Sequence, residues 1–298
     1  MACGLFLLYK EAGMTSQTAV KRLSRLYGGE KAGHTGTLDP LAEGVLPVLI
    51  GRAVKASEFL LCGEKKYIAH LRLGLRSDTE DITGTLTPSA LPLPTEEEVM
   101  AILPRFRGEI LQTPPMYSAL KVGGKKLCDL ARAGVEIDRT PRPITVHTLE
   151  AERIGDGEYR LSVHCSKGTY IRTLCADIGD VLGVGGVMSR LLRAEAAGYT
   201  LDKTHTLAEA EALSPEEREG LLIPLSDVFS RFPRIDLPPF FARLALSGAP
   251  IYQKKIGAHI PMDEIVTFYD DQGFFALAKS DTDEEGERIL RSLRLFRI

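Results

Sequence analysis

The sequence predicts an α+β protein that ends in a small β-rich domain. Strand-like runs and amphipathic helical segments both occur along residues 1–230. Two strand-like runs, residues 144–154 and 159–165, flank a Gly-Asp-Gly turn that is typical of an antiparallel hairpin. From residue 234 onward, aromatic residues fall in short strand-like runs separated by glycine and aspartate turns. We therefore expect one large domain over residues 1–230 and a second, β-rich domain over residues 231–298.

The elements of the large domain can be placed in order from their patterning. Thr15-Ser16 offers a cap for a helix whose apolar residues recur at helical spacing until Gly28-Gly29 ends it. Thr95, followed by three glutamates, opens another helix with a capping-box pattern. The other expected elements are strands over residues 1–10, 45–50, 65–73 and 187–199, helices over 53–61 and 171–182 and up to 133, and two short helices within 206–222.

The composition is that of a globular protein. The 298 residues are 44% hydrophobic and 26% charged, which suffices for a substantial core. No apolar run reaches the length of a membrane span, and the N-terminal apolar patch lacks the basic leader of a signal peptide. The five cysteines include no Cys-x-x-Cys pair. We expect neither a disulfide framework nor a zinc site, and reduced thiols fit a cytoplasmic protein.

Residues 33–47 are unlike the rest of the chain. Three glycines and two prolines in this span exclude a regular helix and predict a shaped loop. Pro40 pushes the preceding Asp39 towards an extended backbone, so Asp39 is not expected to cap a helix. A carboxylate on a rigid loop that leads into a buried strand is well placed for chemistry. The alternative is an Asx-turn aspartate that only closes the loop.

Tyr67 and Arg172 each admit two interpretations. Alternation over residues 65–73 places Tyr67 on the face of the core residues, where an interior tyrosine with a bonded hydroxyl is the simpler reading. Arg172 lies in the first turn of a helix, where a cation opposes the helix dipole, and this position hints at a partner carboxylate. An ordinary surface arginine remains the alternative.

A basic segment lies in the middle of the chain. The net charge is −3, yet residues 101–142 contain more Lys and Arg than Asp and Glu. Within it, residues 114–126 combine two prolines, an aromatic residue, a glycine turn and several lysines. An arm over about residues 112–142 could therefore hold a nucleic-acid backbone, although a solvated surface explains the charge as well.

Three stretches then stand together in order and spacing: residues 33–40, residues 65–67 and residues 166–172. Together they closely resemble motifs of the bacterial tRNA pseudouridine-55 synthase family. Residues 115–121 and 124–127 match this family too. The resemblance covers about residues 4–200 and continues more faintly to the end of the chain, where the family carries a small PUA-like RNA-binding domain.

The resemblance implies a pseudouridine synthase fold, in which a large mixed, mostly antiparallel sheet with flanking helices contains a central cleft. It implies an enzyme that isomerises the uridine at position 55 in the T-loop of tRNA. No cofactor or metal is implied, because the isomerisation neither gains nor loses atoms or electrons. The expected partner is the tRNA T-stem-loop, with no membrane or obligate protein partner, and the expected state is a cytoplasmic monomer.

The resemblance also assigns roles to residues. Asp39 is the implied catalytic carboxylate, Arg172 its ion-pair partner, and Tyr67 an aromatic platform for the base that also helps move a proton. The implied substrate-binding residues are Tyr67 itself, His34, which helps flip the nucleotide out, Tyr170, Leu191 and Lys10. This chain departs from the family where Lys10 is followed by Glu11 instead of the usual proline.

The reaction mechanism and the identity of the target RNA each leave alternatives open. An ionised carboxylate could attack the base, attack the ribose or assist formation of a glycal. A synthase acting on another RNA, alone or in a guide complex, is the nearest rival function, although the chain has no long basic tails. A tRNA-binding or tRNA-folding protein without catalysis is the rival from another class.

Overall fold

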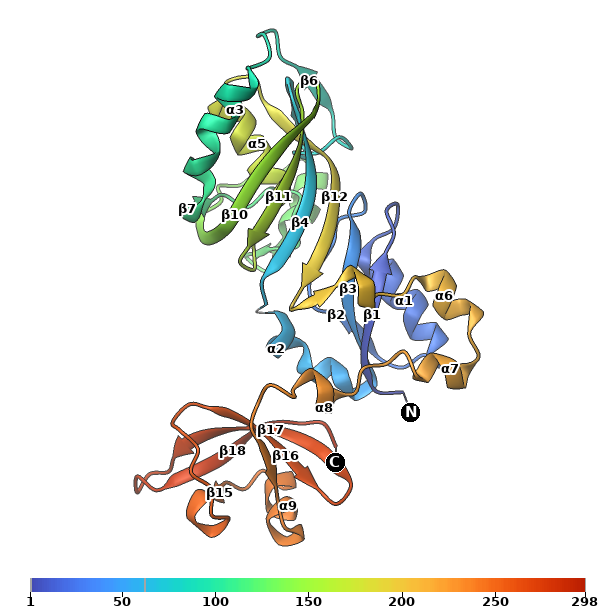
Figure 1. Cartoon of the computed structure of the whole chain (residues 1–298), viewed down its shortest axis with the longest axis vertical. Coiled ribbons are helices and arrows are strands. Elements are labelled where there is room, and N and C mark those ends of the chain that lie inside the picture. The colour runs from blue at the N-terminus through green and yellow to red at the C-terminus, as the bar shows by residue number, and fades with distance from the viewer. Residues whose placement is uncertain (1, 62, 298) are drawn as a thin grey trace.

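The computed structural model describes residues 2–61 and 63–297 of the chain (Figure 1). Two sheets organise these residues, and they lie at opposite ends of an elongated molecule. The larger, nine-stranded sheet is built from the first 200 residues, and the smaller, five-stranded sheet from residues 234–295. Within the described residues, no helix is long and apolar enough to cross a membrane.

The nine-stranded sheet has the order β1-β3-β12-β4-β11-β10-β7, with β2 added to β3 and β13 added to β12. All its pairings are antiparallel except that of β3 with β12. The expected α+β class with a mixed, mostly antiparallel sheet is thus confirmed. The strands are β1 Gly4–Lys10, β2 Ala32–His34, β3 Glu43–Ile50, β4 Lys65–Leu73, β7 Gly108–Gln112, β10 Arg142–Gly155, β11 Glu158–Cys165, β12 Gly186–Ala196 and β13 Tyr199–Thr200.

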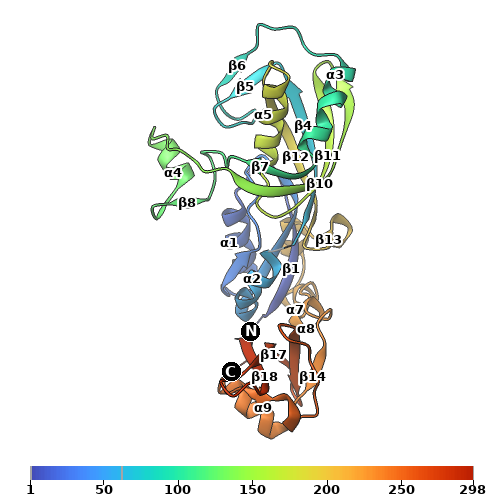
Figure 2. The same ribbon diagram turned by 90° about the vertical axis from the view of Figure 1, so that its left-hand side faces the viewer.

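One face of this sheet is covered by helices. Helices α1 (Ser16–Leu26) and α5 (Ile171–Val181) pack their apolar residues into the same core cluster as the buried residues of β4 (Figure 2). On β4, Tyr67, Ala69 and Leu71 point into this core, and the alternate residues lie on the other face, as the two-residue period of a strand requires. Helix α3 (Glu96–Ile102) begins with the capping box expected at Thr95.

Several loops differ from expectation. The shaped loop is shorter than residues 33–47, because β2 pairs with β3 and β3 already begins at Glu43, which leaves residues 35–42 between them. The pairing of β2 with β3 gives the backbone of these two strands its hydrogen-bond partners. The glycine and proline content of the segment does not indicate this pairing. The expected helix over 53–61 is a 3-10 turn, η1 (Gly51–Ala56), followed by α2 (Ser57–Leu61). The expected strand over 187–199 is divided into β12 and β13, and β7 was not foreseen.

An arm projects from the side of the sheet between β7 and β10 (Figure 2). It carries a short hairpin followed by a helix, and its lysines at 121, 125 and 126 are exposed. A second small hairpin lies between β4 and α3, in a segment for which no strand was expected. The elements are the arm's β8 (Lys121–Val122), β9 (Lys125–Lys126) and α4 (Leu127–Arg132), and the second hairpin's β5 (Leu75–Ser77) and β6 (Leu86–Pro88).

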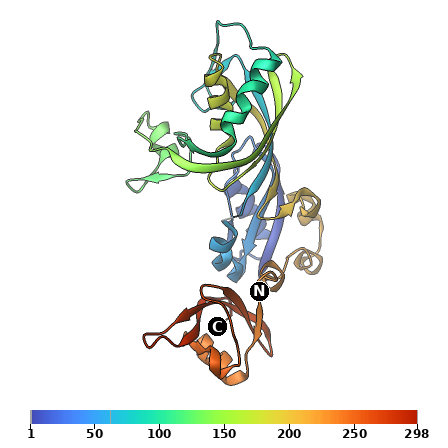
Figure 3. The ribbon, with the colours of Figure 1, turned by 60° about the vertical axis from the view of Figure 1, so that its left-hand side comes forward.

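The C-terminal sheet has the order β14-β16-β17-β18-β15 and its own apolar cluster. Helix α9 (Pro239–Leu246) lies beside this sheet (Figure 3), and the strand-like aromatic runs did not indicate it. A 3-10 turn, η4 (Gln253–Lys255), follows β15. A separate cluster joins Leu277 and Phe296 of this sheet region to Leu5 and Leu49 of the large sheet. The strands are β14 Arg234–Asp236, β15 Ile251–Tyr252, β16 Ile265–Asp270, β17 Gly273–Thr282 and β18 Arg288–Leu295, and the connecting helices are α6 Leu207–Ala212, α7 Pro215–Glu219 and α8 Leu225–Val228.

Gly179 allows α5 to approach the start of β12. A Cβ atom at this position would lie 2.0 Å from the backbone nitrogen of Gly186, far inside van der Waals contact. The Gly185 nitrogen also donates a hydrogen bond of 2.9 Å to the Gly179 carbonyl. This backbone-to-backbone contact sets the position of α5, and therefore of Arg172 in its first turn.

We expect Gly179→Ala to lower the free energy of unfolding by about 1–3 kcal/mol or more, because the added methyl group overpacks a backbone contact. Gly155→Ala is the control, since its Cβ would meet no atom nearer than 3.4 Å. That change should alter stability by less than about 0.5 kcal/mol. Urea denaturation of both variants measures the difference, and equal stabilities would show that the α5 contact is not tight.

Candidate active site

The loop over residues 35–42 is fixed by buried polar side chains from neighbouring elements. The Ser16 hydroxyl, on α1, donates to the Leu38 carbonyl and accepts from the Leu38 N–H, both at 2.8 Å. Arg193, fully buried on β12, donates to the carbonyls of Val45 at 2.7 Å and Gly36 at 3.1 Å. These bonds fix a backbone segment that makes no strand pairing of its own. The loop is therefore rigid and holds the side chain of Asp39 in one position.

Asp39 and Arg172 form an ion pair. Nε of Arg172 lies 2.8 Å from Oδ2 of Asp39, so Arg172 has the carboxylate partner that its place in the first turn of α5 suggested. Its other two nitrogens donate to the carbonyls of Thr79 and Tyr117, each at 2.9 Å. The Arg172 side chain is only 5% exposed, whereas that of Asp39 is 34% exposed. The guanidinium is therefore held on three sides while the carboxylate stays accessible.

A small cavity opens beside this ion pair. It is lined by Asp39, Tyr67, Tyr170, Arg172 and Leu191, five of the residues singled out in the sequence. Burial raises the pKa of the Tyr67 hydroxyl above its ordinary value, although nearby Arg193 opposes the shift, so the phenol stays protonated at neutral pH. The cavity thus presents a carboxylate, an aromatic ring and an aliphatic side chain to one small space.

A wider groove meets the cavity at Asp39 and runs toward the arm. His34 lines it together with Lys126 and Arg132 of the arm. Burial and the charge of Arg193 both lower the pKa of His34, which favours the neutral ring, and Nδ1 of this ring accepts a hydrogen bond from the Gly36 N–H at 3.3 Å. The groove therefore joins a neutral histidine and basic arm residues to the cavity.

Lys10 is buried beneath the loop that carries Asp39. It was expected among the substrate-binding residues, but its side chain is 1% exposed and lines neither the cavity nor the groove. Its ammonium donates to the carbonyls of Ala42 at 2.6 Å and Glu11 at 2.9 Å. Lys10 therefore supports the loop that carries Asp39, and its assignment to substrate binding stays a prediction.

Three supporting residues were missed in the sequence. Arg193 gave no distinct signal, because its strand also carries Arg190 and Glu195. Ser16 was read only as part of a helix cap, whereas Thr15 is the cap. Gln112 gave no signal, yet its amide bonds both the N–H and the carbonyl of Tyr170, at 2.8 and 3.0 Å. The supporting role of each of these three residues depends on contacts with a segment far away in the sequence.

Comparison with known proteins identifies the family. A model described as the N-terminal domain of TruB family pseudouridylate synthase matches residues 24–171, and one described as the C-terminal domain of tRNA pseudouridylate synthase B matches residues 172–228. The tRNA pseudouridine synthase B of Alkaliphilus oremlandii is 40% identical over 295 residues, which cover 98% of this chain and 98% of that protein. The chain belongs to the TruB family of pseudouridine synthases. Its TruB relative in Aromatoleum aromaticum is 41% identical over 278 residues, covering 93% of this chain and 89% of that protein.

Solved structures agree with this TruB assignment at the level of the fold. A chain in the crystal structure of a Cbf5-Nop10-Gar1 complex matches with a TM-score of 0.73 and 25% identity, over 99% of this chain and 85% of that one. A chain in the archaeal box H/ACA Nop10-Cbf5 complex matches with a TM-score of 0.69 and 24% identity, over 99% of this chain and 86% of that one. The pseudouridine synthase fold expected from the motifs is therefore confirmed, and the chain is an RNA-modifying isomerase.

We expect Lys10 to make stability depend on pH. Burial lowers the pKa of Lys10 from 10.5 to about 8. Between these values the unfolded chain binds more protons than the folded one, so the free energy of unfolding rises with pH across this window. The rise should be up to about 3 kcal/mol. Chemical denaturation at pH 7.5 and 9.5 compares the two proteins. The change in the free energy of unfolding between these pH values should be more positive in the wild type than in Lys10→Met, by up to about 2 kcal/mol. Parallel profiles would contradict the assignment.

Proposed function

We propose that this chain isomerises the uridine at position 55 in the T-loop of tRNA to pseudouridine, with Asp39 as the catalytic carboxylate. The observation that carries the proposal is the Asp39–Arg172 ion pair at the mouth of a cavity that Tyr67 and Leu191 also line. A carboxylate that is both positioned and accessible is the group that this chemistry requires.

The reaction breaks the bond between N1 of uracil and C1′ of ribose, turns the base, and joins C5 to C1′. The proton that leaves C5 is returned to the ring nitrogen, so atoms and electrons balance. Asp39 acts on the base or on the ribose, or assists formation of the glycal. Arg172 holds the Asp39 carboxylate in an ion pair of 2.8 Å, and a guanidinium stays charged in a buried site where a lysine amine can lose its proton.

The target base must leave its stack to reach Asp39, which costs a few kcal/mol. In the proposal Tyr67 receives the extruded base on its ring, and Leu191 and Tyr170 enclose it. His34 occupies the vacated place, because a neutral, half-buried ring on the groove wall can stack on the neighbouring bases. In the proposal the Tyr67 hydroxyl, whose pKa is raised by burial, also helps to move a proton late in the reaction.

The arm and the C-terminal sheet are proposed to bind the rest of the tRNA. The arm, over about residues 112–142, places Lys126 and Arg132 on the groove that leads to Asp39. In this division residues 1–230 form the catalytic domain and residues 231–298 a PUA-like RNA-binding domain. Near-neutral net charge favours recognition of the T-loop by shape over bulk attraction.

We also propose that the enzyme works as a cytoplasmic monomer without an obligate protein partner. The described cysteines at 3, 128, 165 and 175 are free thiols, which suits a reducing compartment. The Cbf5 neighbours are found in multiprotein complexes, so the monomer is the point to test. Sedimentation of the purified chain with and without tRNA measures it, and activity that needs an added protein would refute it.

Asp39→Asn should abolish product formation, a fall of more than about a thousandfold, because the amide carries no charge. An unmodified tRNA transcript is incubated with each protein, and pseudouridine is mapped chemically. Product at position 55 from the wild type alone supports the proposal, product elsewhere indicates another target, and binding without product from the wild type indicates a non-catalytic protein.

Arg172→Lys should lose roughly 10- to 100-fold in turnover while tRNA affinity stays near that of the wild type, because one charge-assisted hydrogen bond to Asp39 is lost. Single-turnover kinetics and filter binding separate the two effects. Near wild-type turnover would show that the pairing does not serve catalysis.

Binding of tRNA should weaken steeply with salt, because the arm releases counterions from phosphates. Lys125→Gln and Lys126→Gln should each reduce the slope of log affinity against log salt by about one. Lys203→Gln, at an exposed lysine of the 3-10 turn η3 (Leu201–Lys203), is the control and should leave the slope unchanged. Unchanged slopes in all three variants would exclude the arm as the electrostatic contact.

A further inference from the structure

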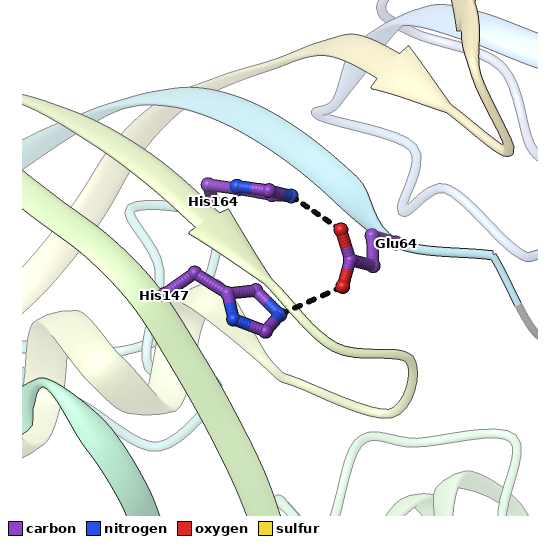
Figure 4. Close-up of side chains that lie close together, drawn as sticks. All are labelled: Glu64, His147 and His164. Carbon is purple, nitrogen blue, oxygen red and sulfur yellow. Dashed lines mark hydrogen bonds and ion pairs between the residues drawn. The ribbon is translucent and has the colours of Figure 1, made fainter.

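Away from the candidate active site, one cluster of side chains has the composition of a metal site. Glu64, His147 and His164 offer three ligand atoms that lie within 4.8 Å of one another. Nε2 of His147 lies 3.0 Å from one oxygen of Glu64, and Nε2 of His164 lies 2.8 Å from the other. Figure 4 shows both rings directing these nitrogens at the same carboxylate.

A β-bulge brings the two histidines together. Val146 pairs with Cys165 and Thr148 pairs with His164, so His147 is an extra residue on β10 with no partner in the register. A bulge re-aims the side chain of the inserted residue. The rings of His147 and His164 consequently lie with their centroids 4.7 Å apart.

Glu64 lies directly before the third strand of the cluster, β4. His164 pairs with Lys66 on β4, and Glu64 lies two residues before Lys66, so the alternation of a strand places it on the same face. The ammonium of Lys66 is engaged by Glu195 at 2.8 Å. Lys66 is therefore already paired with another carboxylate.

We propose that Glu64, His147 and His164 bind a divalent transition metal of the zinc class. Imidazole nitrogen with one carboxylate is a ligand set that suits zinc, nickel or copper, whereas magnesium and calcium prefer oxygen ligands alone. All three side chains are partly exposed, at 55% for Glu64, 36% for His147 and 27% for His164, so a cation can enter from solvent. Water completes the coordination.

This site is independent of the proposed function and lies on the other face of the sheet from Tyr67. Its ligands come from β10, from β11 and from the residue before β4. A bound cation would tie these three segments together, and binding to the folded chain alone would stabilise it. The sequence did not indicate this cluster, because its residues lie far apart along the chain and the bulge that brings His147 to His164 has no local sequence signal.

Zinc binding by the full-length protein, stripped with EDTA and titrated calorimetrically with zinc chloride, tests the proposal. We expect one tight site per chain, weakened at least about tenfold in His164→Asn and Glu64→Gln. His70→Asn is the matched control, because His70 lies on β4 with the same alternation as Lys66 but outside the cluster. Equal zinc affinity in the wild type and all three variants would overturn the site.

Two further readouts separate this site from binding by thiols. Cobalt substitution should give visible d–d bands without a thiolate charge-transfer band, and a strong thiolate band would assign the metal to cysteine and overturn the proposal. Zinc should raise the melting temperature of the wild type and of His70→Asn but not of His164→Asn. In EDTA the variants should melt near the wild type, since their side chains are partly exposed, and an equal zinc-induced shift in all of them would also contradict the assignment.

Discussion

The candidate active site depends on how buried donors fix the backbone of residues 35–42. A loop without a regular ladder leaves its carbonyls to be satisfied by other groups, and a buried carbonyl without a partner costs about 1–3 kcal/mol. Here Lys10 from β1, Ser16 from α1 and Arg193 from β12 supply hydrogen bonds to it. Because these donors belong to three different elements, the loop takes its shape only when the whole sheet and its helix are assembled.

The same requirement governs the ion pair. A guanidinium as buried as that of Arg172 needs a compensating charge and acceptors for its remaining N–H groups. Asp39 supplies the charge, and the Thr79 and Tyr117 carbonyls supply acceptors. The unequal exposure of the two partners matters, because the more exposed carboxylate keeps part of its surface for a reactant while the arginine anchors it.

The fold class and the central residues could be predicted from the sequence because their signals are local. Alternation marked β4 and placed Tyr67 inward, and Asp39 before Pro40 marked a loop carboxylate. The supporting residues could not be found this way, since the bonds of Gln112 to Tyr170 and of Ser16 to Leu38 span long sequence separations. The contact of Lys10 with the loop could not be found from its motif either, because only the packing of β1 against the loop shows where its ammonium points.

The apolar cluster between the two sheets has a consequence for how the chain can be divided. Leu5, Leu49, Phe229, Leu277 and Phe296 pack in one cluster, so atoms from both ends of the chain fill a single interior. Cutting the chain after residue 230 would expose an apolar surface on β1 and β3, and such a fragment would tend to self-associate. The C-terminal segment therefore covers apolar side chains of the large sheet, and it cannot be exchanged as an independent domain.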